Sequence, residues 1–265
     1  MFHLLLAVSV AAAAPVALPE PAQARPAMFV VRDQDTTIYI FGTFHALDGQ
    51  SNWLSGNVQT AFEGSQELIL ETLVPRHPSF PSVAAPALAG FGVTASGSFL
   101  ATTRLAISAG QSRGMNVANG ADMVLRHIAE SEGKPVDGLE TFDSQLRMFA
   151  RIPSALAPRA RPAALPTDDG TDAPDLSSTM SDLQSAWKRG DQTMFVRMLD
   201  EFRRSSPDAY RVMFTERNAR WADWIAARLR TPGTVFVAVG AGHLVGKDSV
   251  LVRLAEHGIE SSRQN

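Results

Sequence analysis

The residues of this sequence best suited to chemistry are two histidines that end the same short pattern, Gly-x-x-His. The first pattern reads Gly42-Thr43-Phe44-His45 and the second reads Gly240-Ala241-Gly242-His243. Imidazole is the side chain that most readily changes charge near neutral pH, and it is a common metal ligand. Two imidazoles with one or two carboxylates suit a divalent metal that keeps open positions for water.

Each pattern follows an apolar run with the length and β-branched content of a buried strand, at residues 38–41 and 235–239. We expect glycine to end each strand by allowing a sharp backbone exit. Both histidines then lie just past the carboxyl end of a strand, which is the edge where open α/β sheets bind ligands. The sequence therefore predicts a common site for His45 and His243.

Two glutamates share this placement, since Glu71 closes the apolar run at 67–71 and Glu140 follows the run at 134–139. If the four strands are parallel, these side chains converge on one edge of the sheet. We expect His45, His243 and Glu71 to hold a metal whose bound water is the nucleophile, with a spare carboxylate as general base. Alternatively, each histidine or glutamate is a polar group at a strand end that faces water, and the glycines only terminate strands.

Arg217 and Asn218 interrupt the apolar stripe of a long helix predicted from residue 206 to about residue 230. A guanidinium on the core side of a helix needs a partner, which could be one of the glutamates, a substrate carboxylate or the oxyanion of a hydrolytic intermediate. Alternatively, Arg217 lays its stem along the tryptophans and reaches water. Asn218 could hold a neighbouring backbone in place. The stripe consists of Tyr210, Phe214, Trp221, Trp224 and Ile225.

Composition narrows the possible functions. The net charge of −3 and the pI near 6.1 provide no basic surface for nucleic acid or an anionic membrane. The 265 residues contain no cysteine, which excludes disulfides and thiolate ligands or nucleophiles. The sequence also lacks a Gly-x-Ser-x-Gly elbow, a phosphate-binding loop and a dinucleotide fingerprint.

The first 24 residues have the pattern of a signal peptide. An apolar run at 4–14 precedes Ala22-Gln23-Ala24, a small-x-small cleavage pattern, so we predict cleavage after Ala24 and a periplasmic or secreted protein. The run is shorter than the roughly 20 residues that span a bilayer, so no stable membrane anchor is expected after cleavage. The alternative is an uncleaved apolar anchor.

The remaining residues, 25–265, are expected to form one α/β domain with a mixed, mostly parallel central sheet flanked by helices. A Pro-, Ala- and Asp-rich segment at 158–175 is predicted to be a flexible linker or insertion, and 75–98 a long loop. Predicted strands are 28–31, 36–41, 67–71, 134–139 and 235–239. Predicted helices are 53–64, 120–132, one from 141, 178–189, 191–204, 206–230 and 249–257.

The order of these motifs resembles the TraB/GumN family, which includes the Tiki metalloproteases. The matching pieces are 26–29 with the hairpin into the first Gly-x-x-His, the strand ending at Glu71, 133–141 with Gln145, Arg217-Asn218 and 239–244. The resemblance implies an internally duplicated, EreA/ChaN-like core whose two Gly-x-x-His elements meet at one site. It implies catalytic roles for Glu71, Glu140, Arg217 and Asn218, and a Mn, Co or Zn ion.

Two functions are carried forward from the sequence. The first is an exported metal-dependent hydrolase that cleaves a peptide or protein substrate. The second is a non-catalytic protein that holds a ligand or haem at the same site, as one branch of the wider superfamily does. A third possibility, an interaction module of surface polysaccharide or conjugation systems, rests only on the names of relatives. The sequence does not define the oligomeric state.

Overall fold

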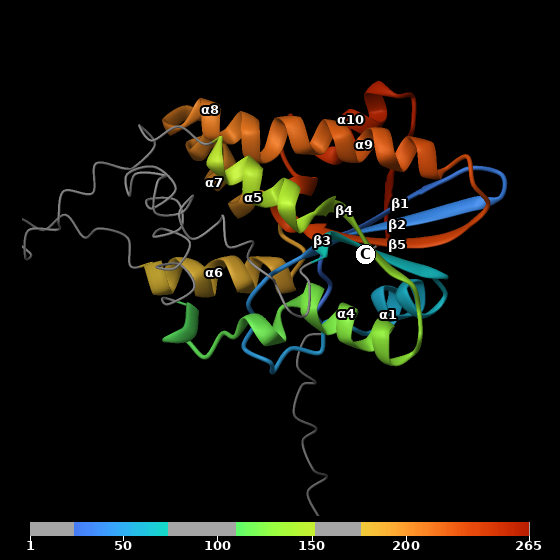
Figure 1. Cartoon of the computed structure of the whole chain (residues 1–265). Coiled ribbons are helices and arrows are strands. Elements are labelled where there is room, and N and C mark those ends of the chain that lie inside the picture. The colour runs from blue at the N-terminus through green and yellow to red at the C-terminus, as the bar shows by residue number, and fades with distance from the viewer. Residues whose placement is uncertain (1–23, 74–109, 152–175, 265) are drawn as a thin grey trace, which may run out of the picture.

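A six-stranded sheet organises the described part of the chain (Figure 1). The computed structural model describes residues 24–73, 110–151 and 176–264. The strands lie in the order β4-β3-β5-β2-β1-β6. Their bounds are β1 Met28–Arg32, β2 Thr36–Thr43, β3 Glu67–Leu73, β4 Val136–Thr141, β5 Gly233–Gly240 and β6 Ser262–Arg263.

Strands β2, β5, β3 and β4 are mutually parallel, whereas β1 pairs antiparallel with both β2 and β6. The predicted mixed, mostly parallel sheet is therefore confirmed. The strands that carry the two Gly-x-x-His patterns are direct neighbours, paired from Thr36 with Gly233 to Thr43 with Gly240. Internal duplication of the two halves stays a prediction.

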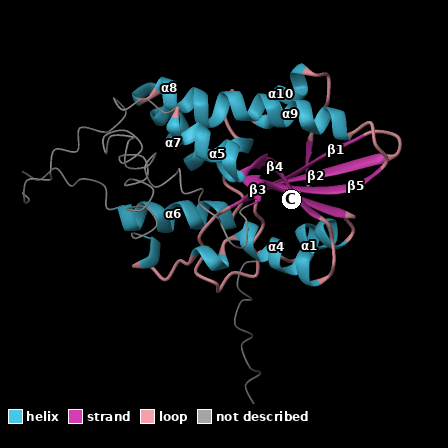
Figure 2. Cartoon of the chain, viewed as in Figure 1, coloured by secondary structure: helices cyan, strands magenta, loops and turns pink. Residues whose placement is uncertain are grey.

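Side chains alternate between the two faces of the sheet, as the period of a strand requires. Ile38, Ile40, Val235 and Val237 belong to one buried cluster with Trp221, Ile225 and Leu254, and Phe41, Phe236 and Ala238 belong to a second one. Helices α9 (Glu216–Arg228) and α10 (Val250–Glu256) cover the first face. Helices α1 (Gly56–Glu63), α4 (Ala121–Ser131) and α6 (Leu176–Lys188) cover the second (Figure 2).

Helix α5 (Phe142–Ala150) begins directly after β4 and so lies at the carboxyl end of the parallel strands, where α7 (Thr193–Ser205) and α8 (Pro207–Tyr210) also gather (Figure 1). The helix predicted at 206–230 is α8, a π-helical turn at Arg211–Thr215 and α9 in succession. The π-helical turn had no indication in the sequence pattern. Such turns occur often at functional sites.

The end of the chain differs from expectation. The segment after α10, for which no strand was predicted, contains β6, whose two residues pair with Phe29 and Val30 of β1. A two-residue strand has too few positions to show the alternation that marks strands in a sequence. The predicted signal peptide up to residue 23, the loop at 75–98 and the linker at 158–175 lie outside the described residues. Among the described helices, none has the length and apolar character needed to cross a membrane.

Candidate active site at the carboxyl edge of the sheet

The six residues predicted for the site lie close together. His45 comes two residues after β2, Glu71 and Glu140 lie near the ends of β3 and β4, and His243 lies in the 3-10 turn Ala241–Leu244 that follows β5. Helix α9 brings Arg217 and Asn218 to the same edge. The convergence expected from parallel strands is therefore present in the structure.

Arg217 is the centre of the cluster. Its Nη2 donates to Glu71 Oε1 at 2.5 Å, and its Nε donates to both oxygens of Glu140 at 3.0 and 3.1 Å. Its side chain is 4% exposed, and the guanidinium lies 4.6 Å from the centre of the Trp221 ring. Arg217 thus pairs with the glutamates, as one alternative predicted. The alternative in which it reaches water is wrong.

His243 is held by Asn218 in a defined tautomer. The amide nitrogen of Asn218 donates to the carbonyl oxygen of Asp248 at 2.7 Å, so the amide oxygen of Asn218 must accept from His243 Nδ1, 2.6 Å away. In the neutral ring this leaves the lone pair on Nε2. That atom lies 3.4 Å from Arg217 Nη1 and 3.8 Å from Glu71 Oε2, so it faces the cluster.

His45 is held in the same way by a residue of a different type. Its Nδ1 lies 3.2 Å from Oδ1 of Asp122, in the first turn of α4. A carboxylate only accepts hydrogen bonds, so Nδ1 carries the proton and Nε2 of the neutral ring carries the lone pair. Hydrogen bonding of one ring nitrogen to a carboxylate or carbonyl is typical of histidines that bind a metal through the other nitrogen.

Each motif glycine makes room for the other motif. A Cβ at Gly42 would lie 3.3 Å from the Cα of Ala241, and a Cβ at Gly240 would lie 3.1 Å from His45 Nε2 and 3.4 Å from Glu71 Oε2. Neither glycine has a positive φ. The expectation that they provide a sharp backbone exit is therefore wrong, because close approach of the two motifs is what requires glycine.

The environment drives the two imidazoles in opposite directions. Burial lowers the pKa of His243 to about 3, and the charges of Arg217 and His45 act in the same direction against Glu71. Desolvation also opposes the charged ring of His45, but the hydrogen bond and charge of Asp122, aided by Glu71, raise the pKa of His45 to about 9. The side chain of His45 is 58% exposed, so water moderates this shift.

Glu71 is stabilised as a carboxylate. Burial would raise its pKa, but the charge of Arg217 and those of the two histidines, with the hydrogen bond from Arg217, hold the pKa of Glu71 far below its usual range. The same pairing raises the pKa of Arg217 against the effect of its burial. The second oxygen of Glu71 accepts from the backbone N–H of Gly240 at 3.2 Å and faces both imidazoles.

The donor set suits a divalent cation in the type of its atoms, imidazole nitrogen and carboxylate oxygen. His45 Nε2, Glu71 Oε2 and His243 Cδ2 border the space that a Cβ of Gly240 would fill, and His243 Nε2 lies 3.8 Å from Glu71 Oε2. Beside Gly240 on β2, the hydroxyl of Thr43 is buried without a partner among the described residues. In the described part of the chain, however, no three His, Cys, Asp or Glu residues form a group that could hold a metal ion as they stand. A metal ion bound to His243 Nε2 would have to displace the contact between that atom and Arg217 Nη1.

Sequence reasoning missed Asp122 and Trp187 as outer partners of the first motif. An acidic residue in the first turn of a helix is common for reasons of helix polarity alone, so Asp122 had no distinguishing pattern. Trp187 of α6 is buried in the core, and its Nε1 donates to the carbonyl oxygen of Gly42 at 2.7 Å. Only the fold reveals these partners, since they are 77 and 145 residues away from the motif they hold.

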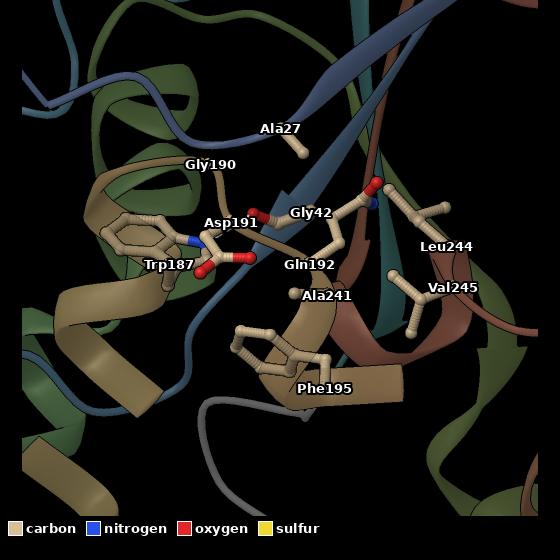
Figure 3. A pocket seen from close by; sticks show the side chains of 10 residues that line it. All are labelled: Ala27, Gly42, Trp187, Gly190, Asp191, Gln192, Phe195, Ala241, Leu244 and Val245. Atoms are coloured by element: carbon tan, nitrogen blue, oxygen red, sulfur yellow. Dashed lines mark hydrogen bonds between the residues drawn. The ribbon is translucent and has the colours of Figure 1, made fainter. Parts of the chain in front are cut away.

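The contact between the motifs is visible at a small pocket in which Gly42 and Ala241 lie close together (Figure 3). Trp187, Phe195 and Leu244 also line it, and neither His45 nor His243 does. The lining is apolar around the two motifs, so this pocket is a packing feature beside the site. We therefore place the candidate active site at the histidines and not at this pocket.

The fold and the site together define a class: mixed α/β proteins that gather two histidines, two glutamates and an arginine at the carboxyl edge of a mostly parallel sheet. The sequence profile of the TraB/PrgY/gumN family matches residues 27–87 and 89–263. The chain belongs to this family, which confirms the resemblance identified from its motifs. No curated protein and no solved structure matches the chain.

Proposed function

We propose that the protein is an exported, divalent-metal-dependent hydrolase that cleaves peptide bonds. The observation that supports this best is the matched orientation of the two imidazoles. Asp122 and Asn218 hold the Nδ1 atoms, so each ring turns its Nε2 edge toward Glu71. His45 Nε2 and Glu71 Oε2 border one small space beside Gly240, and His243 Nε2 lies 3.8 Å from Glu71 Oε2. Nitrogen and carboxylate donors without thiolate suit Mn, Co or Zn. The resemblance to the Tiki metalloproteases suggests peptide or protein substrates.

Each residue of the cluster has a distinct role in this proposal. A divalent ion held by His45, His243 and Glu71 would supply Lewis acidity and a water nucleophile near neutral pH. The lowered pKa of Glu71 suits a ligand better than a proton acceptor. Arg217 fixes the direction of Glu71 through Nη2 and is itself anchored by Glu140 through Nε.

Glu140 is the remaining candidate for general base. Its side chain is 7% exposed, and it accepts hydrogen bonds from Arg217 and from Arg220 Nη2 at 3.1 Å. We therefore assign Glu140 first to positioning Arg217. A role as base requires that Glu140 exchange one of these arginines for the attacking water, and Glu140→Gln separates the two roles. The amide retains an acceptor for arginine but cannot take a proton at neutral pH.

The test uses the mature protein, residues 25–265, freed of metal and then dialysed against Mn²⁺, Co²⁺ or Zn²⁺. We expect one tightly bound ion per chain by elemental analysis and cleavage of some members of a broad peptide library by mass spectrometry. His45→Ala and His243→Ala should abolish both. His257→Ala is the matched control, since His257 is 43% exposed and pairs with Asp223 outside the cluster. If neither site variant changes metal content or cleavage, the proposal is wrong.

A specific observation favours a second function, binding of a ligand or haem without turnover. Arg217 pairs with both glutamates, so neither carboxylate is free to accept a proton from water. Tight retention of haem or another cofactor, with no cleavage across the same peptide library, would support this function. The His45→Ala and His243→Ala variants should then lose retention of the cofactor, while the library stays uncleaved with wild type and variants alike.

Export to the periplasm or the exterior is part of the proposal. The small-x-small pattern before Arg25 supports it, and a chain cut after Ala24 keeps the hydrogen bond from Arg25 N to the carbonyl oxygen of Lys188 at 2.7 Å. Expression of the full chain followed by N-terminal sequencing of the exported product should give Arg25 as the first residue. A product that retains Met1 in the membrane fraction would indicate an uncleaved anchor instead.

A further inference from the structure

We propose that Asp122 is a positioning residue of the candidate site, which holds the imidazole of His45 with Nε2 directed toward Gly240. The contact that carries this inference is the 3.2 Å hydrogen bond from His45 Nδ1–H to Asp122 Oδ1. Among the described residues, only Asp122 forms a hydrogen bond with the His45 ring. The consequence for metal binding rests on the proposed function, whereas the orientation of the ring does not.

The segment that carries Asp122, residues 116–122, is hydrogen-bonded to the backbone on both sides of His45. Ala121 N donates to the carbonyl oxygen of Phe44 at 3.0 Å, before His45. Leu47, after His45, forms an isolated two-way bridge with Asn116, with N to O distances of 3.2 and 2.8 Å. These bonds fix the first turn of α4 relative to His45, so Asp122 is placed by backbone contacts and not by its own side chain alone.

Gly120 makes this close approach possible. A Cβ at Gly120 would lie 2.8 Å from the carbonyl carbon of His45 and would overlap its carbonyl oxygen. The φ of Gly120 is −54°, a value that alanine adopts without strain, so the requirement for glycine is one of space. The segment and the first motif therefore form one unit in which Asp122 faces His45.

An exposed imidazole needs such a partner more than a buried one. The side chain of His45 is 58% exposed, whereas that of His243 is 7% exposed and is packed between Phe214 and Trp221 at ring distances of 4.7 and 4.4 Å. Packing restricts the His243 ring, but water surrounds much of the His45 ring. A fixed acceptor at Nδ1 therefore decides both the tautomer and the direction of His45.

The first test reads the ring directly. In ¹⁵N spectra of the metal-free protein, recorded at a pH high enough for the His45 ring to be neutral, we expect that ring to carry its proton on Nδ1. Asp122→Ala should redistribute that proton toward Nε2, and Asp122→Asn, which keeps an acceptor oxygen, should preserve the Nδ1–H form. Asp143→Ala is the matched control, because Asp143 also lies in the first turn of a helix and is 66% exposed in a pair with Arg147.

The second test measures binding of Zn²⁺ alone by calorimetry. Loss of an outer hydrogen-bond partner typically lowers metal affinity roughly 10- to 100-fold. We expect a loss of this size for Asp122→Ala, a smaller one for Asp122→Asn and none for Asp143→Ala. The proposal is overturned if Asp122→Ala leaves the His45 ring nitrogens unchanged, or if Asp143→Ala changes them equally.

Failure of the metal proposal is distinguishable from failure of this one. If wild type binds no Zn²⁺ but Asp122→Ala still changes the His45 tautomer, the positioning role stands and the metal site is wrong. Gly120→Ala provides a variant that leaves Asp122 intact. We expect it to push the segment away from His45 and to give the same change in ring nitrogens, with unchanged far-UV circular dichroism.

Discussion

The two Gly-x-x-His motifs occupy equivalent places on neighbouring parallel strands, yet their histidines differ in burial and in hydrogen-bond partner. His243 is buried between aromatic rings and donates to an amide, and its pKa falls to about 3. His45 is 58% exposed and donates to a carboxylate, and its pKa rises to about 9. One motif therefore supplies a neutral imidazole and the other a readily protonated one.

This difference teaches that the motif sets the position of a histidine, whereas its burial and its outer partner set its charge. Burial disfavours the charged ring, and an amide oxygen compensates this less than a carboxylate does. A site with one permanently neutral imidazole keeps a lone pair available at all physiological pH values. The other imidazole loses its proton only when a cation or a rise in pH replaces it.

The largest expected effect concerns the buried half of the site, which contains His243, Arg217 and Glu71. It tests whether the stability of the protein depends on the charges in this half. Arg217→Met removes the guanidinium that holds both glutamates, which leaves Glu71 without its arginine and Glu140 with only the exposed Arg220. We expect the free energy of unfolding to fall by about 3–5 kcal/mol. Urea denaturation followed by circular dichroism measures this change.

Arg220→Met is the control for this variant. Arg220 also donates to Glu140, but its side chain is 54% exposed, so its loss should cost less than about 1 kcal/mol. Equal costs for the two variants would show that burial of Arg217 does not determine the stability of the buried half.

The second prediction gives His243 a carboxylate partner, like the one that His45 has in Asp122. Asn218→Asp loses the hydrogen bond from the amide to the carbonyl oxygen of Asp248 and should destabilise the protein by about 1–3 kcal/mol. The new charge beside Nδ1 should raise the pKa of His243 above about 3. An NMR titration of the His243 ring measures the shift, and an unchanged pKa would refute the importance of the outer partner.

The third prediction separates the two motif glycines. A methyl group at Gly42 meets the backbone of Ala241, so Gly42→Ala should cost about 1 kcal/mol of stability. A methyl group at Gly240 meets the ends of the His45 and Glu71 side chains, which can move by a few tenths of an ångström. Gly240→Ala should therefore spare stability and lower Zn²⁺ affinity instead. Thermal unfolding and calorimetry distinguish the two outcomes.

The sequence predicted the fold and the members of the cluster because strand ends are local signals. Apolar runs before His45, Glu71, Glu140 and His243 marked four strands, and the parallel arrangement then implied one edge. Arg217 stood out because a charge within an apolar stripe requires a partner. These inferences need only the periodicity of strands and helices.

The sequence could not reveal the features of the site that depend on contacts between segments far apart in the chain. Asp122 looks like an ordinary first-turn acid until α4 is seen beside His45. The role of Gly42 and Gly240 depends on the closeness of the two motifs, and pattern alone suggested a turn. The opposite pKa shifts of His45 and His243 follow from burial and partners, which identical motifs cannot reveal.

The smallest expected effect concerns the exposed half of the site, which consists of His45 and Asp122. Asp122→Asn should bring the pKa of His45 down from about 9 toward its ordinary 6.5, with a stability change below about 1 kcal/mol because water screens the pair. In wild type, a raised pKa means that the stabilisation by protonated His45 is complete below pH 6.5 and is lost as the pH rises through about 9.

For His243 the sign is opposite. Its folded-state pKa of about 3 means that stability is lost as the pH falls from 6.5 toward 3. The two histidines of the metal-free protein should thus favour the folded state most near pH 6.5, with Asp122→Asn flattening only the alkaline side. Urea denaturation from pH 3 to pH 10 measures both slopes. A variant that flattened the acid side instead would mean that the partners of the two motifs do not control their histidines separately.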